Sequence, residues 1–284
     1  CCCLSARSPN RINFMQNKLG IFLRTFLLQG YWNFARLQNV GMLYIMEPVL
    51  KRLYKNRPAI YLRAKARNLE TFNSHPSMSV YSIGDMIKQE EKLAGLEGDE
   101  LLEEEREWRI IRASTANTAA SIGDRLFWAV LKPLSLVFCF VILFVGQVDM
   151  VRDDVVTEQS FVAALLALAG SLLIYNIPSL FIRFKGLKDS YLGSEDNFYG
   201  LINLNWNKTI GFLKLLGQVL VIFVIFYAVY IRFRNSPMDP DSIARISLLA
   251  AFLILSIFMR KLNIPNIFLY LIATLVFGIA AFLA

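Results

Sequence analysis

Residues 71–85 read Thr-Phe-Asn-Ser-His-Pro-Ser-Met-Ser-Val-Tyr-Ser-Ile-Gly-Asp, and the rest of the chain is best understood from this polar stretch outward. It contains the only histidine of the protein, His75. A run of hydrogen-bonding side chains interrupted by a proline is not typical of a helix interior. We therefore predict a broken or re-entrant element here. In an otherwise apolar chain, such a polar break is where a ligand is expected to bind.

The rest of the chain is unevenly apolar. Hydrophobic residues make up 56% of the 284 residues, and they dominate positions 128–284, whereas positions 1–127 mix charge with hydrophobicity. A helix needs roughly 20 mostly apolar residues to span a bilayer. Segments that approach this length are 127–148, 161–182, 215–231, 246–259 and 264–284. The sequence therefore predicts an all-α polytopic membrane protein, with an amphipathic and re-entrant helical N-terminal half and about five spanning helices.

Three regions follow from this pattern: a polar tail over 1–18, an amphipathic and re-entrant region over 19–124, and a transmembrane region over 125–284. The amphipathic segment 19–53 fits a membrane surface, a partner's helices or a soluble helical hairpin. Within 87–112 lies a strongly acidic run. We interpret this run as a solvated cytoplasmic helical hairpin that turns near 95–98, or as an acidic docking surface for a basic partner.

The distribution of charge predicts the orientation. The formal net charge is +8, and the basic residues gather in 51–67 and 183–214, beside apolar runs. The positive-inside rule places these segments and the N-terminus in the cytoplasm, and the acidic loop 149–158 outside. No nucleic-acid-binding motif accompanies the positive charge. The cysteine and histidine spacing predicts no metal site and no cofactor, and no nucleophile–base pair suggests an enzyme.

Several segments together carry a family resemblance, and they occur in order along roughly residues 20–195. They are Leu-Gln-Gly-Tyr-Trp-Asn-Phe at 28–34, Phe-Asn-Ser-His-Pro at 72–76, Ile-Gly-Asp-Arg-Leu-Phe-Trp at 122–128 and Tyr-Asn-Ile-Pro at 175–178. The sequence resembles the IID component of the mannose/fructose/sorbose family of the bacterial sugar phosphotransferase system. It departs from that family's pattern at 113–121, where a Gly-Pro pair is missing, and at Asn68.

The resemblance implies a multi-pass subunit of the bacterial cytoplasmic (inner) membrane. It would pair with the channel-forming IIC subunit in oligomers of IIC–IID heterodimers, and carry a mannose-type hexose across the lipid bilayer. The soluble IIB or IIAB subunit would phosphorylate the sugar. Asn73, Ser74, His75 and Pro76 would lie at a hairpin tip near the sugar path. The altered segment 113–121 motivates an alternative, a diverged homologue that serves as a membrane scaffold or regulatory partner without sugar transport.

Individual residues keep more than one interpretation. His75 either stabilises a turn or contacts sugar, with a phosphoacceptor or metal ligand as the weakest reading. Asp124, after Gly123, either caps the helix of the first span or lines a polar path. For Asn176 and Pro178 we expect a structural role: they kink a helix, and neighbouring groups re-satisfy the backbone groups that the kink frees. A contact with sugar is the less favoured alternative. Gln38 and its neighbour Asn39 would face IIC or the membrane interface.

Overall fold

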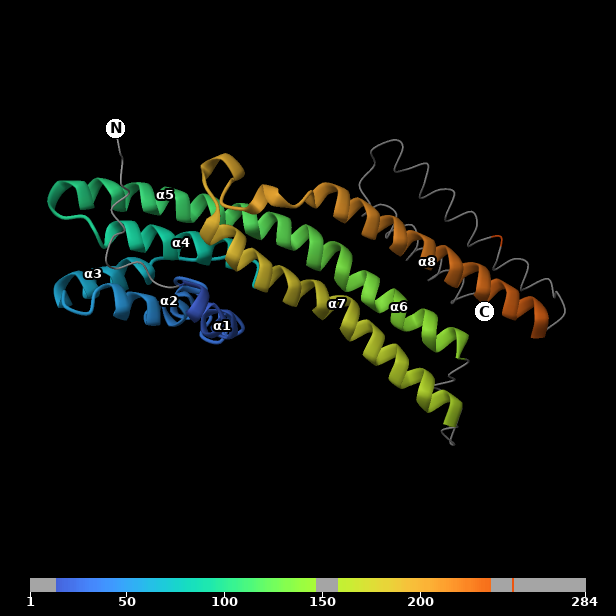
Figure 1. The fold of residues 1–284 in the computed structure, drawn as a ribbon. Coiled ribbons are helices and arrows are strands. Elements are labelled where there is room, and N and C mark those ends of the chain that lie inside the picture. Colours follow the sequence, from blue (N-terminus) through green and yellow to red (C-terminus); the bar gives the residue numbers. More distant parts are fainter. Residues whose placement is uncertain (1–13, 147–157, 236–246, 248–284) are drawn as a thin grey trace. The chain divides into compact units, whose positions relative to one another are not determined.

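The computed structural model describes residues 14–146, 158–235 and 247. The α-helices of these residues are α1 (Phe14–Thr25), α2 (Asn39–Leu53), α3 (Pro58–Asn68), α4 (Val80–Leu93), α5 (Gly98–Gly123), α6 (Lys132–Val145), α7 (Glu158–Leu192) and α8 (Trp206–Asn235). A π-helix, η1 (Asp124–Leu131), joins α5 to α6, and short 3-10 turns η2 (Glu195–Asn197) and η3 (Leu201–Asn203) precede α8 (Figure 1). The described residues contain isolated β-bridges but no strand, so the all-α prediction is confirmed.

The chain divides into two compact units, and the boundary falls inside α8, between Val224 and Ile225. The first unit holds every feature discussed below. The segments 246–259 and 264–284, predicted as the last two spans, lie outside the described residues except for residue 247, and so does most of the acidic loop 149–158.

Helices α2 to α4 and the start of α5 form a helical cluster that is shown in blue to green in Figure 1. Helix α2 turns its apolar face inward, whereas residues 80–87 of α4 are buried on every side. Large buried side chains come from α2 (Met42, Ile45), from α4 (Ile83, Met86) and from α5 (Trp108). This packing gives the N-terminal half a core of its own.

A buried ion-pair network joins three helices of this cluster. Arg67, at the end of α3, donates from Nε to Oε1 of Glu90 in α4 at 2.9 Å, and from one terminal nitrogen to Oε1 of Glu105 in α5 at 3.0 Å. Its other terminal nitrogen donates to Tyr54 Oη at 2.9 Å, and Asn68 Nδ2 donates to Glu90 Oε1 at 2.8 Å. The side chains of Arg67, Glu90 and Glu105 are at most 4% exposed. Such charges stay buried only because each has partners.

This network shows that the acidic run is solvated only in part: Glu97, Asp99 and Glu100 are exposed, but two other acids of the run are buried. Helices α4 and α5 do reverse at residues 94–97, but Glu90 and Glu105 point inward to Arg67. Arg67 in turn belongs to the basic segment 51–67, whose charge the sequence assigned to the cytoplasmic surface. Part of each charged segment is therefore used to hold the helices together, and is not available for docking.

The first apolar span is the far end of one continuous helix. Residues Gly98–Val145 run without a break through α5, η1 and α6. The helix therefore begins well before the apolar span expected from residue 127, and residues 113–123 are ordinary helix. Pro133 has no N–H to donate back into the helix and would crowd the carbonyl four residues earlier. The wider turns of η1 end directly before this proline, where they relax that conflict.

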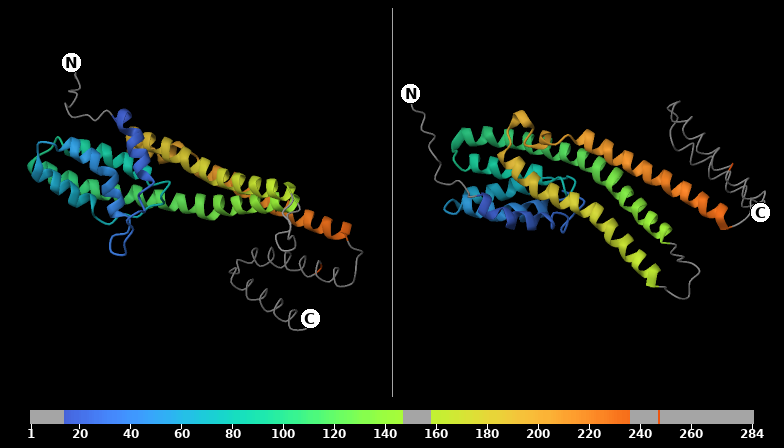
Figure 2. Two further views of the ribbon diagram at one scale, coloured as in Figure 1. Left: turned by 90° about the horizontal axis from the view of Figure 1, so that it is seen from below. Right: turned by 45° about the vertical axis from the view of Figure 1, so that its right-hand side comes forward.

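Long apolar helices confirm the membrane character. By length and composition, three helices of the described residues can cross a bilayer: Gly98–Val145, Ser160–Leu192 and Trp206–Ala228. Helices α6 and α7 lie side by side in all views of Figures 1 and 2. Few side chains of the apolar segments are buried within the chain, and large ones such as Phe140 and Leu166 are exposed. This exposure is what lipid contact requires.

Helix α7 continues ten residues beyond the expected span end at 182, because its last turns pack against α4. Helices α4 and α7 approach each other so closely that each needs a glycine at the contact. A Cβ on Gly84 would lie 1.9 Å from Ser190 Oγ, and a Cβ on Gly186 would lie 2.8 Å from the ring of Tyr81. Residues 80–85 of the opening stretch are thus regular helix. Only residues 71–79 form the expected break.

Candidate functional site

The candidate site is the segment between α3 and α4, residues 69–79, which we call the His75 loop. Its start is held against the turn before α2 by a backbone hydrogen bond from Gln38 to the Phe72 carbonyl at 2.9 Å. The side chain of Gln38 then pairs with the backbone of Ser74. Gln38 Nε2 donates to the Ser74 carbonyl at 2.9 Å, and Ser74 N donates to Gln38 Oε1 at 3.0 Å.

These bonds correct the expectation for Gln38 and Asn39. The two side chains are only 2% and 5% exposed, so they face neither a partner nor the membrane interface. Asn39 Nδ2 donates to the Leu69 carbonyl at 3.0 Å, at the other end of the same loop. Both amides are therefore positioning residues for the His75 loop, since each can donate and accept at once.

The imidazole of His75 sits between the loop and the long helix. It is 4% exposed and stacks on Phe127 of η1, with ring centroids 4.6 Å apart and planes 12° apart. Trp128 approaches edge-on at 6.1 Å. Gly123 makes this contact possible, because a Cβ there would lie 2.3 Å from His75 Cβ and 2.5 Å from Cγ. The structure thus brings together Gly123 and His75, which the sequence placed in two separate motifs.

The hydrogen bonds of the ring indicate its tautomer. Ser77 N donates to His75 Nδ1 at 3.3 Å, so Nδ1 is the acceptor and the proton of a neutral ring lies on Nε2. Burial, and secondly the positive charge of Arg183, lower the pKa of His75 from 6.5 to about 4. The ring is therefore neutral near pH 7. Nε2 is buried and has no hydrogen-bond partner among the described residues, which leaves one donor unused.

This environment argues against the two weakest interpretations of His75. A phosphoacceptor would need an open approach to the ring, which burial denies. No group of three or more His, Cys, Asp or Glu side chains that could hold a metal ion is present in the described part of the chain. What the ring can do is donate one hydrogen bond from a fixed position.

Other hydroxyl groups connect the His75 loop to the membrane helices. Ser77 Oγ and Ser179 Oγ of α7 lie 2.7 Å apart, one residue after Pro178. Ser74 Oγ donates to the Ala116 carbonyl of α5 at 3.1 Å, inside the segment that departs from the family pattern. The loop is therefore tied to both long helices. Among its predicted members, Ser74 is buried, Pro76 is half-buried and Asn73 is exposed.

The remaining predicted residues lie elsewhere. Asp124 is exposed and lies inside a continuous helix, so it caps no helix start and that interpretation is wrong. Asn176 is exposed on α7, where its Nδ2 donates to the Leu172 carbonyl at 2.8 Å, one turn back along the same helix. It supports the helix near Pro178, which removes one backbone donor. Neither residue contacts the His75 loop through a hydrogen bond given by the structure.

Arg183 is a member of the site that sequence reasoning missed. It was grouped with the basic loop after the second span, but it is 7% exposed. One terminal nitrogen donates to the Thr25 carbonyl at 3.0 Å and to Thr25 Oγ1 at 3.2 Å, and the guanidinium lies over the Phe26 ring. Its Nε is buried without a partner in the described structure. The sequence feature that could have identified Arg183 is its position directly after an apolar run.

A second buried titratable group lies on α4 beyond the loop. Asp85 is fully buried; its Oδ1 accepts from Gln89 Nε2 at 3.4 Å, and Oδ2 has no partner among the described residues. Burial raises the pKa of this carboxyl to about 7, helped by Glu195 and opposed by Gln89 and Lys88. Asp85 is therefore a poor candidate for a charged ligand contact, and it faces the protein interior.

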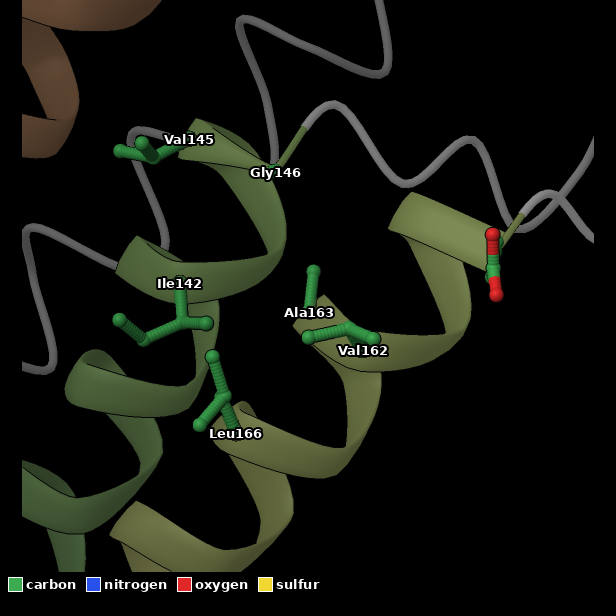
Figure 3. A pocket seen from close by; sticks show the side chains of 7 residues that line it. Ile142, Val145, Gly146, Val162, Ala163 and Leu166 are labelled. Atoms are coloured by element: carbon green, nitrogen blue, oxygen red, sulfur yellow. The ribbon is translucent and has the colours of Figure 1, made fainter.

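A cavity of about 500 Å³ lies between the ends of α6 and α7, away from the His75 loop (Figure 3). Its labelled side chains, Ile142, Val145, Val162, Ala163 and Leu166, are aliphatic, and Glu158 is its single charged lining residue. Ligand sites for hydroxyl-rich molecules need several convergent polar groups. This cavity lacks them and belongs to the lipid-facing part of the helices.

Comparison with known proteins settles the family. Residues 16–283 match the model described as the PTS system mannose/fructose/sorbose family IID component. The chain belongs to this family. The resemblance in its motifs predicted this family.

Named relatives agree with the family. The mannose-specific EIID component of Escherichia coli K12 is 33% identical over 115 residues, which is 40% of our chain and 39% of that one. The fructose permease IID component of Bacillus subtilis 168 is 31% identical over 117 residues, 40% of each chain. The sorbose-specific EIID component of Klebsiella pneumoniae is 31% identical over 41% of each. The aligned segments thus span less than half of the relatives' length.

Solved structures share the fold over nearly the whole chain. A cryo-EM structure of the mannose transporter ManYZ in complex with microcin E492 gives a TM-score of 0.52, at 22% identity, over 96% of our chain and 97% of that one. A second structure, described as a membrane protein, gives a TM-score of 0.59 at 21% identity, over 94% and 96%. At this identity the likeness concerns the fold alone.

Proposed function

We propose that this chain is the IID subunit of a hexose permease, which forms a membrane complex with a IIC subunit and carries the sugar across the bilayer. The sugar is phosphorylated by the soluble IIB or IIAB subunit, and this chain supplies no catalytic residue. The family assignment supports the proposal, and so do the sugars named for its relatives, mannose, fructose and sorbose. The complexes assemble as oligomers of IIC–IID heterodimers.

The observation that carries the site is the unused donor of His75. Its ring is neutral, it is fixed by Phe127 and Ser77, and its Nε2–H has no partner in the described structure. Sugars offer hydroxyl oxygens that accept such a bond, and a neutral donor binds them without a desolvated charge. Because Nε2 is buried in the described state, sugar binding on this proposal requires the His75 loop to move away from the long helix. Asn73 adds an exposed amide on the same loop, next to the packed Ser74 and beside half-buried Pro76.

The orientation follows the distribution of charge. The N-terminal region and the basic loop 183–214 lie in the cytoplasm, and the acidic loop 149–158 lies outside. Two of the apolar helices, α6 and α7, lie side by side and run in opposite directions, so they connect these sides (Figure 1). The His75 loop, tied to α7 at Ser179, then lies toward the cytoplasmic end of the span. Sugar released from this depth is accessible to a soluble IIB subunit.

Sugar uptake by the reconstituted IIC–IID pair tests the role of the loop. His75→Ala and Asn73→Ala are compared with wild type, with Thr71→Ala as a matched control at an exposed position of the same segment. Loss of one buried hydrogen bond to substrate costs about 1.5 kcal/mol, or roughly tenfold in apparent affinity. His75→Gln, which retains a donor, is expected to recover part of the loss. Unchanged uptake in both alanine variants, at unchanged thermal stability, would show that the His75 loop has no role in sugar transport.

A second candidate function is favoured by the depth at which the loop is packed. Ser74 and His75 are 3% and 4% exposed in this chain, and most of their polar atoms are bonded within it. A diverged homologue that serves as a membrane scaffold or regulatory partner would keep such a loop for stability alone. Uptake measurements separate the two functions, because a scaffold supports assembly with IIC but gives no sugar transport with any hexose.

A further inference from the structure

The connection between α1 and α2 exposes a group of aromatic side chains. Tyr31 is 70% exposed, Trp32 is 46% exposed and Phe34 is 93% exposed. We call these three residues the aromatic tip. In the left view of Figure 2, the chain between α1 and α2 forms a loop that stands away from the helices. Aromatic side chains bury large areas when they find a partner, so three of them in water are costly.

The aromatic tip is held in a defined conformation. Asn33 and Leu37 exchange two backbone hydrogen bonds, at 3.0 and 2.9 Å, and Leu37 takes a positive φ of 60° to close the turn. The Asn33 side chain accepts from Arg36 N at 2.8 Å and donates to Asn39 Oδ1 at 2.8 Å. Trp32 and Phe34 meet edge-to-face at 4.8 Å. The loop therefore presents its rings in a fixed arrangement.

The apolar surface of the tip is continuous with the membrane-facing surface of α7. Phe184 on α7 is 50% exposed and packs edge-on against Phe22 of α1 at 5.7 Å, and Phe22 packs against Phe26 at 5.3 Å. Phe26 and Leu27 are 47% and 52% exposed and lead directly into the tip. An exposed path of apolar side chains thus joins the spanning helix to the loop.

This contact also sets the level of the tip along α7. Phe184 follows Arg183, the first charged residue after the apolar part of that helix. The Arg183 guanidinium is bonded to Thr25 inside the protein, but the apolar run of α7 ends here, so Phe184 lies near the end of the stretch that hydrocarbon can cover. Trp and Tyr are concentrated at the same depth in membrane proteins, because their rings are apolar and their N–H and O–H groups are polar.

Two arginines border the aromatic tip. Arg36 is exposed at its end, and Arg24 lies on the preceding helix, where it stacks over the Tyr44 ring at 4.3 Å. One terminal nitrogen of each guanidinium donates to a backbone carbonyl, Arg24 to Tyr44 at 3.0 Å and Arg36 to Leu69 at 3.3 Å. Their remaining N–H groups and their charge complement anionic headgroups while the aromatic rings enter the acyl boundary. We propose that the aromatic tip inserts into the headgroup–acyl boundary of the same bilayer that α7 spans, and anchors the N-terminal helices to it. The partner is thus lipid and not protein.

Spin labelling of the full chain in vesicles tests this anchor. Phe34→Cys is labelled in a background in which Cys1, Cys2, Cys3 and Cys139 are replaced by serine. Leu62→Cys on α3 is the matched control, since Leu62 is also apolar and 65% exposed but lies outside the aromatic surface. Vesicles of phosphatidylcholine and phosphatidylglycerol are used. We expect the label at 34 to lose accessibility to a water-soluble nickel complex and gain it to oxygen, and the label at 62 to show the reverse.

The same measurement separates lipid from protein as the occupant. It is made on vesicles that hold this chain alone and on vesicles that also hold the IIC subunit. Protection of position 34 in both supports the anchor, whereas protection only with IIC, or nickel access equal to that at 62, overturns it. As a label-free check, brominated lipid should quench wild-type tryptophan fluorescence more than that of Trp32→Phe. Equal quenching would contradict the proposal. Neither readout depends on sugar transport, so the anchor and the permease function fail separately.

Discussion

The packing of the His75 side chain against the long helix can be tested by adding a single methyl group at Gly123. In Gly123→Ala the new Cβ would lie 2.3 Å from His75 Cβ, 2.5 Å from Cγ and 3.0 Å from Met78 Cγ. The first two atoms are not the ends of a flexible chain. They are held by the stack on Phe127 and by the bonds of the loop to Gln38, so the helix or the loop has to move.

The expected free-energy change is the difference between two effects. Overpacking a well-ordered core costs about 1–3 kcal/mol, and contacts as close as these belong at the upper end. Replacing glycine by alanine inside a helix is worth about 1 kcal/mol in the opposite direction. The net destabilisation of Gly123→Ala is therefore about 2 kcal/mol. Gly20→Ala is the matched control, because it lies in α1 with nothing within 4 Å of the added Cβ, and it should stabilise slightly.

Unfolding in detergent, followed by tryptophan fluorescence, measures both variants. Trp128 lies 6.1 Å from the His75 ring, so its emission also reports a displaced loop before global unfolding. We expect lower stability and a shifted native emission for Gly123→Ala only. If Gly123→Ala is as stable as Gly20→Ala and leaves the emission unchanged, then the close contact between η1 and the His75 loop does not exist, and the proposed site loses its foundation.

Two further predictions concern buried charge. Arg67→Met leaves the buried carboxylate of Glu90 without its partner and should lower the free energy of unfolding by about 3–5 kcal/mol. Arg57→Met, whose partner Glu97 is mostly exposed, should lower it by less than about 1 kcal/mol. Equal losses of unfolding free energy in denaturant titrations would contradict the network. The folded pKa of Asp85 lies near 7, above its ordinary 3.8, so ionisation disfavours the folded state as the pH rises from 4 to 8. Asp85→Asn should remove this pH-dependent loss of stability, which amounts to at most about 4 kcal/mol. If the difference in unfolding free energy between wild type and Asp85→Asn does not grow with pH, the prediction is refuted.

The sequence predicted best those features that are decided by residues only a few positions apart. A proline within a run of short hydrogen-bonding side chains disfavours a helix interior, and residues 71–79 are indeed irregular. Long apolar runs have few alternatives to membrane helices, and α6, α7 and α8 follow them. The turn at 94–97 was also visible, because glycines interrupt the charged pattern there. Each of these features depends on neighbours within a few positions.

Features that depend on distant partners were not predictable in the same way. Gln38 and Ser74 are 36 residues apart, and an exposed amide has the same sequence signature as a buried one. Arg67, Glu90 and Glu105 each lie in segments whose charge density is typical of a surface, and only the packing of α3, α4 and α5 turns them inward. The helix start expected near Asp124 was wrong because residues 113–123 are compatible with helix and nothing before Pro133 interrupts it.

The π-helical segment η1 has a consequence for how the chain tolerates change. Each π turn holds one residue more than an α turn needs, so η1 stores spare length at the point where α5 becomes α6. Removing one residue from Asp124–Leu131 would let the rest of the segment close as ordinary α-helix, whereas the same deletion in a regular α-helix rotates everything after it by about 100° around the helix axis. The face that the membrane part of the helix offers to lipid or to a partner is therefore kept after a single deletion in this segment, and the upstream helices keep their packing. Insertions and deletions in relatives of this chain, where they exist, should gather in this short segment.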